Sequence, residues 1–161
     1  MKKQRVTQLE KTKMQAELLV PLIEGMEREL GREQAHRLVR ESLGPMLREA
    51  VRTSHTPGEE RQAVQKILHI SKSVDAQDHV PVPSAEDEIN VDITRCEYAE
   101  FFQQLGRPDL GFLLVCERDL DLIDGLEDVE MARTTTIMMG SPKCDFRFRF
   151  RPNVRTPRQP E

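Results

Sequence analysis

The chain contains three cysteines, and all of them lie in its C-terminal part, at positions 96, 116 and 144 of 161 residues. A thiolate is the strongest nucleophile and the softest metal ligand among unmodified side chains. We therefore expect any chemistry to be concentrated around Cys96, Cys116 and Cys144, with the first half of the chain as a scaffold.

Cys96 is the first candidate for a catalytic nucleophile. It stands near the start of a helix that we predict over residues 95–105, with Thr94 as capping residue and Glu97 completing a capping box. Free backbone N–H groups and the helix dipole at such a position lower the pKa of a thiol, and Arg95 adds positive charge. The alternative is a small, half-buried residue at a strand–helix junction.

The other two cysteines are candidates for the same pocket. Cys116 follows an apolar run and precedes Asp119 by three residues, a spacing that puts both side chains on one face of a helix. Cys144 is expected to point inward with the phenylalanines of its own alternating run, Phe146, Phe148 and Phe150. For both cysteines, simple packing in the core is the alternative.

Two further residues are candidates for a catalytic base. Glu100 lies one helical turn after Cys96, and His69 lies near the end of a predicted helix. A solvated surface position explains Glu100 equally well. The cysteines are twenty and twenty-eight residues apart, so no local zinc signature exists, and no cofactor is expected. A metal held by all three thiolates is the remaining alternative.

The first half of the chain is predicted to be helical. Apolar residues recur three or four positions apart over residues 6–30, 32–53 and 58–72. Pro21 is expected to kink or split the first helix, and Gly44-Pro45 to bend the second.

In the second half of the chain, the spacing of the apolar residues changes. Residues 73–86 are expected to form a loop, because they are rich in Asp, Pro and Ser. Alternation of apolar and polar residues then predicts a strand over 89–93. Two helices are expected to follow, over 95–105 and about 108–123. Two strands within 129–139 and 144–150 are expected to form an antiparallel hairpin with a turn of about four residues.

The sum is an α+β fold, with N-terminal helices packed on a small, mostly antiparallel sheet that ends in a C-terminal β-hairpin. We expect one domain over residues 1–152, with a helical half at about 1–72 and a second half at about 87–151. Residues 153–161 are expected to be a disordered tail.

The composition limits the classes of partner that the protein is expected to bind. The net charge of −4 gives no general attraction to nucleic acid, and no apolar stretch approaches the ~20 residues that span a bilayer. A polar N-terminus and an odd number of cysteines favour reduced thiols in the cytoplasm. The exposed sides of the first two helices make a homodimer possible.

The spaced motifs of the C-terminal half resemble the L-2-amino-thiazoline-4-carboxylic acid hydrolase family. The residues that match are Thr94-Arg95-Cys96-x-Tyr98-Ala99-Glu100-Phe101-Phe102-x-x-Leu105-Gly106, Leu110-Gly111, Val115-Cys116, and Arg133-Thr134-x-Thr136-x-x-x-Gly140-x-x-x-Cys144-Asp145-Phe146-Arg147.

The resemblance implies a small-molecule substrate and a reaction. The family's named enzyme opens a cyclic isothiourea to a carbamoyl-cysteine on the bacterial route to L-cysteine, which needs an activated nucleophile, a proton donor and a cation for the substrate carboxylate. Among the matching residues, Arg95, Tyr98 and Arg133 are the candidates for substrate binding. A more distant similarity to 4-vinyl-reductase-type domains implies the alternative of a non-catalytic, ligand-binding sensory module.

Overall fold

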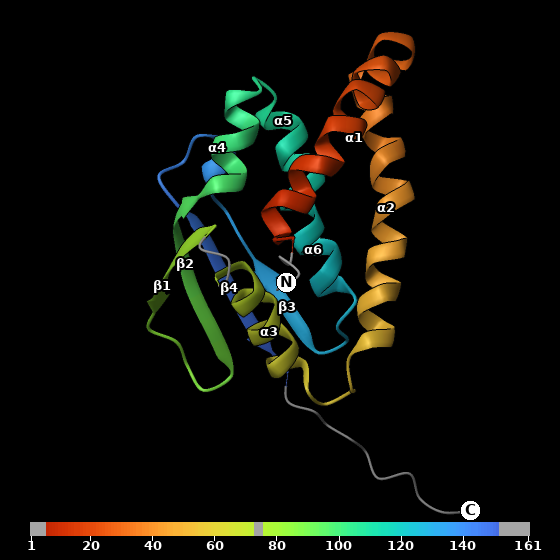
Figure 1. Cartoon of the computed structure of the whole chain (residues 1–161). Helices are drawn as coiled ribbons and strands as arrows, with labels where there is room; N and C mark the ends of the chain where they lie inside the picture. Colours follow the sequence, from red (N-terminus) through yellow and green to blue (C-terminus); the bar gives the residue numbers. More distant parts are fainter. Residues whose placement is uncertain (1–5, 73–75, 152–161) are drawn as a thin grey trace, which may run out of the picture.

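The structure of the chain is a computed structural model that describes residues 6–72 and 76–151 (Figure 1). Its first half consists of the helices α1 (Gln8–Leu30), α2 (Arg32–Ser54) and α3 (Glu60–Lys72). Thr7 and Glu10 form a capping box that starts α1, and Gly31, with a φ of 81°, ends it. Pro21 lies inside α1 without dividing it into two helices.

The second half alternates between strands and helices. It comprises β1 (Gln77–Val82), β2 (Glu88–Cys96), α4 (Glu97–Gln104), α5 (Pro108–Gly111), the π-helical turn η1 (Phe112–Cys116), α6 (Glu117–Asp124), β3 (Val129–Ala132), the 3₁₀ turn η2 (Ile137–Met139) and β4 (Cys144–Phe150). The predicted tail of 153–161 lies outside the described residues.

The four strands form one sheet in the order β1-β2-β4-β3, and every neighbouring pair is antiparallel. Val91 pairs with Phe146, and Ile93 pairs with Cys144, so the buried alternate residues of β2 and β4 share one face. The helices α3 and α6 contact the sheet through β1 and β3, and α4 continues from the end of β2 (Figure 1). The helices α1 and α2 run side by side, with α1 against α4 and α2 against α6. This arrangement confirms the predicted α+β class.

The structure corrects the prediction for residues 73–86. Residues 77–82 form strand β1 rather than a loop, in spite of Pro81. β1 is an edge strand that pairs only with β2, and an edge position tolerates proline because one side of the strand needs no ladder hydrogen bonds.

The prediction of a strand through residues 129–139 is also only partly right. β3 ends at Ala132, and residues 137–139 form a 3₁₀ turn. The β-branched residues make local hydrogen bonds instead: Thr134 and Thr135 donate to the carboxylate of Asp145 through backbone N–H and hydroxyl groups, at 2.5–2.9 Å. β3 and β4 therefore pair across a long connection rather than a tight hairpin turn.

Gly111 is required for the close approach of the α5–α6 segment to its neighbours. A Cβ atom at this position would lie 2.5 Å from Met138 Sδ and 2.6 Å from Phe102 Cβ, and both of these side chains are buried. We expect Gly111→Ala to lower the free energy of unfolding by about 1–3 kcal/mol through overpacking, as measured by urea denaturation.

Gly25→Ala is the matched control for this prediction. A Cβ atom there meets only Arg28 Nη2, at 3.6 Å, so alanine should raise the free energy of unfolding by about 0.5–1 kcal/mol through its higher helix propensity. If Gly111→Ala were as stable as the wild type, the tight packing described here would be wrong.

Among the described residues, no helix combines the length and the apolar character needed to cross a membrane.

Candidate functional site

A pocket of about 310 Å³ opens where the two halves of the chain meet. Five segments line it: α1, α3, β1, α4 and the continuous run from η1 into α6. The lining residues are Gln8, Thr12, Ile67, Gln77, Tyr98, Val115, Arg118, Asp119 and Leu122. The pocket therefore combines an apolar wall with one carboxylate, one guanidinium, one phenol, one aliphatic hydroxyl and two amides.

Asp119 is the acidic group of this pocket, and Arg133 holds it in place. Arg133 Nη1 lies 3.1 Å from Asp119 Oδ2, and the Arg133 side chain is only 3% exposed, whereas that of Asp119 remains 36% exposed. Burial raises the pKa of the Asp119 carboxyl to about 6, and the positive charge of Arg133 opposes this shift only in part. Asp119 can thus exchange a proton near neutral pH.

Arg133 is fixed by three more contacts. Its Nη2 donates to the carbonyl oxygen of Cys116 at 3.0 Å, and its guanidinium carbon lies 5.2 Å from the ring centre of Phe146 and 5.9 Å from that of Phe112. The carbonyl belongs to the π-helical turn, and such turns are frequent at functional sites because they displace the helical hydrogen-bond pattern. Arg133 is therefore a buried positioning group for Asp119.

Tyr98 contributes an unsatisfied hydroxyl to the pocket lining. The residue is 4% exposed, and its hydroxyl oxygen has no hydrogen-bond partner within the described part of the chain. Burial, together with the negative charges of Cys96 and Asp119 when ionised, raises the pKa of Tyr98 to about 12. The phenol thus stays protonated, and it is a hydrogen-bond donor in need of an acceptor.

Cys96 lies beside this pocket, at the N-cap of α4. Thr94 belongs to β2, so the predicted capping role of Thr94 is wrong. The Nε2 of Gln77, which lines the pocket, donates to Cys96 Sγ at 3.6 Å. This contact connects the sulfur to the pocket wall.

The expectation that the helix start makes Cys96 a low-pKa thiol is not met. Burial raises the pKa of Cys96, and the nearby N–H groups of Tyr98 and Ala99 lower it by less. The positive charge of Arg95 does little to lower the pKa of the Cys96 thiol, because its guanidinium pairs with Asp78 at 3.1 Å and with Glu97 at 2.8 Å. A reactive Cys96 therefore needs a base to remove its proton.

Cys116 and Cys144 are buried, and neither is among the residues that line the pocket. Burial raises the pKa of both thiols, and the charges of Asp119, Arg133 and Cys96 act on each of them. Cys144 Sγ also accepts a hydrogen bond from the N–H of Ile137 at 3.3 Å. The negative charge of Asp119 thus raises the pKa of all three thiols.

Two candidates from the sequence lie elsewhere. Glu100 is exposed on α4. His69 is also exposed, and it lines a separate pocket with His79 and Pro81 beside the edge strand β1.

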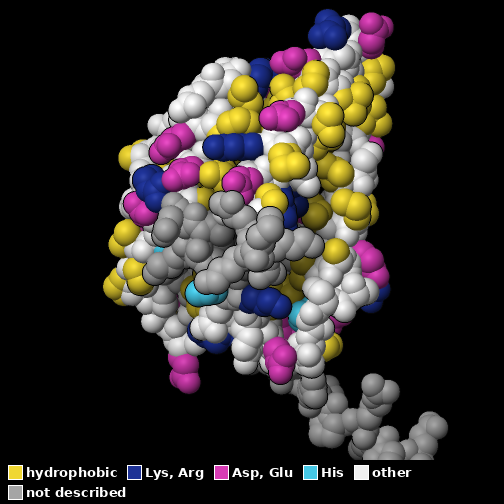
Figure 2. All heavy atoms as spheres, viewed as in Figure 1, with side chains coloured by type: hydrophobic (Ala, Val, Ile, Leu, Met, Phe, Trp, Pro, Cys, Tyr) yellow, Lys and Arg dark blue, Asp and Glu magenta, His cyan; other side chains and the backbone are white. Residues whose placement is uncertain are grey.

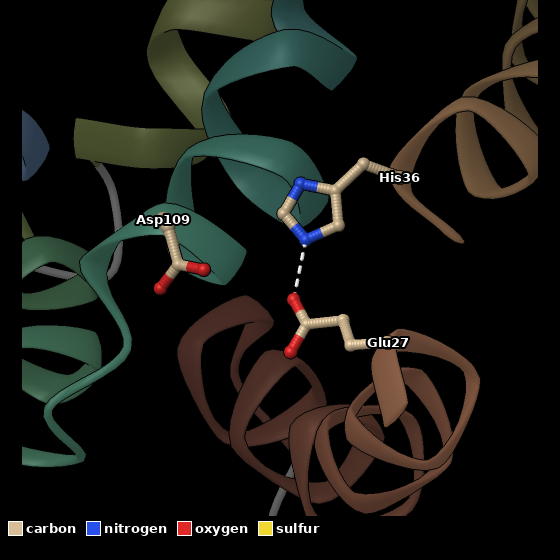
Figure 3. A group of neighbouring side chains, drawn as sticks. All are labelled: Glu27, His36 and Asp109. Atoms are coloured by element: carbon tan, nitrogen blue, oxygen red, sulfur yellow. Dashed lines mark hydrogen bonds and ion pairs between the residues drawn. The ribbon is translucent and has the colours of Figure 1, made fainter. Parts of the chain in front are cut away.

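The cysteines do not form a compact metal site. Within residues 6–72 and 76–151, the only group of three acidic, histidine or cysteine ligand atoms within 4.8 Å of one another belongs to Glu27, His36 and Asp109 (Figure 3). There, His36 Nε2 and Glu27 Oε1 lie 2.7 Å apart. The Nη2 of Arg107 already donates to both Glu27 oxygens and to Asp109, at 2.8–2.9 Å, so this cluster is an ion-pair network that joins α1, α2 and α5.

Sequence reasoning missed several lining residues. Gln8 and Thr12 come from α1, and Gln77 comes from strand β1, a segment that the sequence predicts as a loop. Arg118 precedes Asp119 directly, and a charge next to a candidate acid is the one signal that could have drawn attention to it. The others are brought to the pocket by tertiary packing alone.

The fold and the pocket define an α+β protein with a titratable carboxylate and nearby thiols between its helices and one antiparallel sheet. The sequence model of the L-2-amino-thiazoline-4-carboxylic acid hydrolase family matches residues 11–148, and the chain belongs to this family. No curated protein is similar enough to match. The family's name implies a hydrolase, and the comparisons give no support to the similarity with 4-vinyl-reductase-type domains.

Proposed function

We propose that this protein is a hydrolase that opens a small cyclic amidine or isothiourea, such as 2-amino-thiazoline-4-carboxylate, by breaking its ring C–N bond. Family membership supports the substrate class. The observation that carries the proposal is the Asp119 carboxyl, held by Arg133 Nη1 at 3.1 Å, in the same pocket as the unpartnered hydroxyl of Tyr98. Together they offer a proton acceptor and a hydrogen-bond donor to one ligand.

In the proposed reaction, the substrate binds with its ring nitrogen protonated, as an amidinium. Asp119 takes the proton of the Cys96 thiol, and Sγ adds to the amidinium carbon while the C=N π pair moves to the ring nitrogen. The ring C–N bond then breaks, the exocyclic nitrogen forms the new double bond to carbon, and the ring nitrogen takes the proton from Asp119 and leaves as the amine. Asp119 next deprotonates a water molecule that attacks the same carbon, and the Cys96 thiolate leaves and is reprotonated. The net change is the addition of one water, which yields a free amine and a carbamoyl group on the substrate sulfur.

The remaining pocket groups have binding roles in this proposal. Arg118 lines the pocket and is suited to pair with the substrate carboxylate, whereas the side chain of Arg133 is engaged with Asp119. Tyr98 donates its hydroxyl to a substrate nitrogen or sulfur acceptor. Arg95, with its guanidinium held by Asp78 and Glu97, has no direct binding role here.

Product analysis tests the proposed activity. The purified full chain is incubated with 2-amino-thiazoline-4-carboxylate, and the mixture is followed by ¹H NMR and mass spectrometry. A product heavier than the substrate by one water, with a free α-amine, is expected. Thermal stabilisation by the compound without any product would instead identify a binding protein, and it would contradict the proposed hydrolysis.

Tyr98→Phe is expected to make the protein more stable and its substrate binding weaker. The variant removes a buried hydroxyl without a partner, and such a group costs about 1–3 kcal/mol, so the free energy of unfolding should rise. Substrate binding should weaken by about tenfold, because the ligand loses one hydrogen-bond donor. Denaturation curves and KM measure the two effects, and a destabilised variant with unchanged KM would show that Tyr98 is a structural residue.

A further inference from the structure

The outer face of α1 exposes a stripe of large apolar side chains. Met14, Leu18 and Leu22 lie four residues apart, all three are exposed, and Leu18 is 76% exposed. Their spacing forms one continuous ridge along the helix, on the side opposite to buried Ala16 and its neighbours. Figure 2 shows hydrophobic side chains gathered over the part of the surface where α1 and α2 lie.

A groove runs beside this ridge. It has a volume of about 290 Å³, lies between α1 and α2, and is mostly apolar. Its side toward α2 is formed by Leu43, Met46 and Leu47, of which Met46 is strongly exposed. Large contiguous apolar patches are rare on monomeric proteins and mark interaction surfaces.

We propose that a second copy of this chain covers this face, with the two α1 helices antiparallel about a two-fold axis close to Leu18. A two-fold interface places one surface against itself, so it needs a ridge and a matching groove on the same face, and this face has both. In this arrangement Met14 lies opposite Leu22 of the partner subunit, and each ridge enters the groove of the other copy.

The charges on α1 complement one another in the same arrangement. Lys11 and Glu29 are exposed and lie within about 20° of Leu18 around the helix, at opposite ends of the ridge. They are about 10 and 16 Å from Leu18 along the axis, so an antiparallel copy brings Lys11 within reach of the partner subunit's Glu29. Neither side chain has an ion-pair partner within residues 6–72 and 76–151. Parallel helices would instead place like charges together.

The size of the face also fits a stable dimer. α1 and α2 have 23 residues each and lie side by side. At 1.5 Å per residue and about 10 Å per helix, they present about 700 Å² per subunit, close to the ~800 Å² that specific interfaces bury on each partner. This inference does not depend on the proposed activity.

Sedimentation equilibrium of the full chain tests the dimer. A mass of twice 18.6 kDa is expected for the wild type at micromolar concentration, and a monomer at 100 µM would overturn the proposal. Leu18→Glu should weaken dimerisation by about 30-fold or more, because it buries a charge at the centre of the interface. Leu105→Glu, at an exposed leucine on the end of α4, is the matched control that should remain dimeric.

A charge exchange tests the antiparallel arrangement with less risk to the fold. Lys11→Glu alone should weaken the dimer by about tenfold through two symmetry-related pairs, and adding Glu29→Lys should restore it. Circular dichroism checks that each variant is folded. A Leu18→Glu variant that stays dimeric, a Leu105→Glu variant that becomes monomeric, or a double exchange that restores nothing would each contradict the proposed interface.

Discussion

Asp119→Asn is expected to lower kcat/KM for the cyclic amidine by about 10²–10⁴-fold, the usual contribution of a general base. The amide keeps the size of the side chain, but it cannot accept the proton of the Cys96 thiol or of the attacking water. Asp121→Asn is the matched control, because Asp121 lies on the same helix but pairs with Arg48 of α2, away from the pocket. Steady-state kinetics measures kcat/KM for both variants and for the wild type.

Activity of the wild type is expected to depend on pH through the Asp119 carboxyl. The carboxyl titrates near pH 6, and only its ionised form acts as a base, so kcat/KM should be constant above about pH 7 and fall tenfold per pH unit well below 6. The loss occurs toward low pH because protonation removes the acceptor. An unchanged rate in Asp119→Asn, or equal losses in Asp119→Asn and Asp121→Asn, would show that Asp119 is not the base.

Cys96→Ser and Cys96→Ala are expected to lower kcat by about 10³-fold or more, since the loss of a covalent nucleophile disables the whole sequence of steps. A serine hydroxyl is a far weaker acid than a thiol, and Asp119 cannot ionise it. Both variants should keep the far-ultraviolet circular dichroism of the wild type, because serine and alanine fit the small space of a buried cysteine.

Cys144→Ser is the informative comparison for Cys96. Its sulfur is buried to a similar extent and accepts a hydrogen bond from Ile137, a role that a serine oxygen can fill, so we expect less than about a tenfold loss of kcat. If both Cys96 variants retained activity, the nucleophile would be a water molecule directed by Asp119, and the covalent step proposed above would be wrong.

The sequence predicted the fold class because its hydrophobic periods are clear. The long helices α1 and α2 and the alternation of β2 and β4 follow from local pattern alone. It failed where tertiary context decides: Pro81 is tolerated because β1 is an edge strand, and Thr134 and Thr135 bind the carboxylate of Asp145 instead of extending β3.

The sequence named Cys96, Cys116, Asp119, Tyr98 and Arg133 as candidates, and the structure places them in one region, but the role of each stays a prediction. It could not rank them, because burial decides their protonation. Burial raises the pKa of the Cys96 thiol, and partial burial raises that of Asp119 to about 6, so we propose the carboxylate, rather than the thiol, as the group that transfers protons.

We propose that Asp119 is the base of the pocket, and the pKa of its carboxyl can be measured directly. The protein is labelled with ¹³C at the aspartate side-chain carboxyl carbon, and the Asp119 signal is assigned by its absence in Asp119→Asn. We predict a titration midpoint near pH 6. A midpoint near pH 4, the ordinary value of an aspartate, would contradict the account.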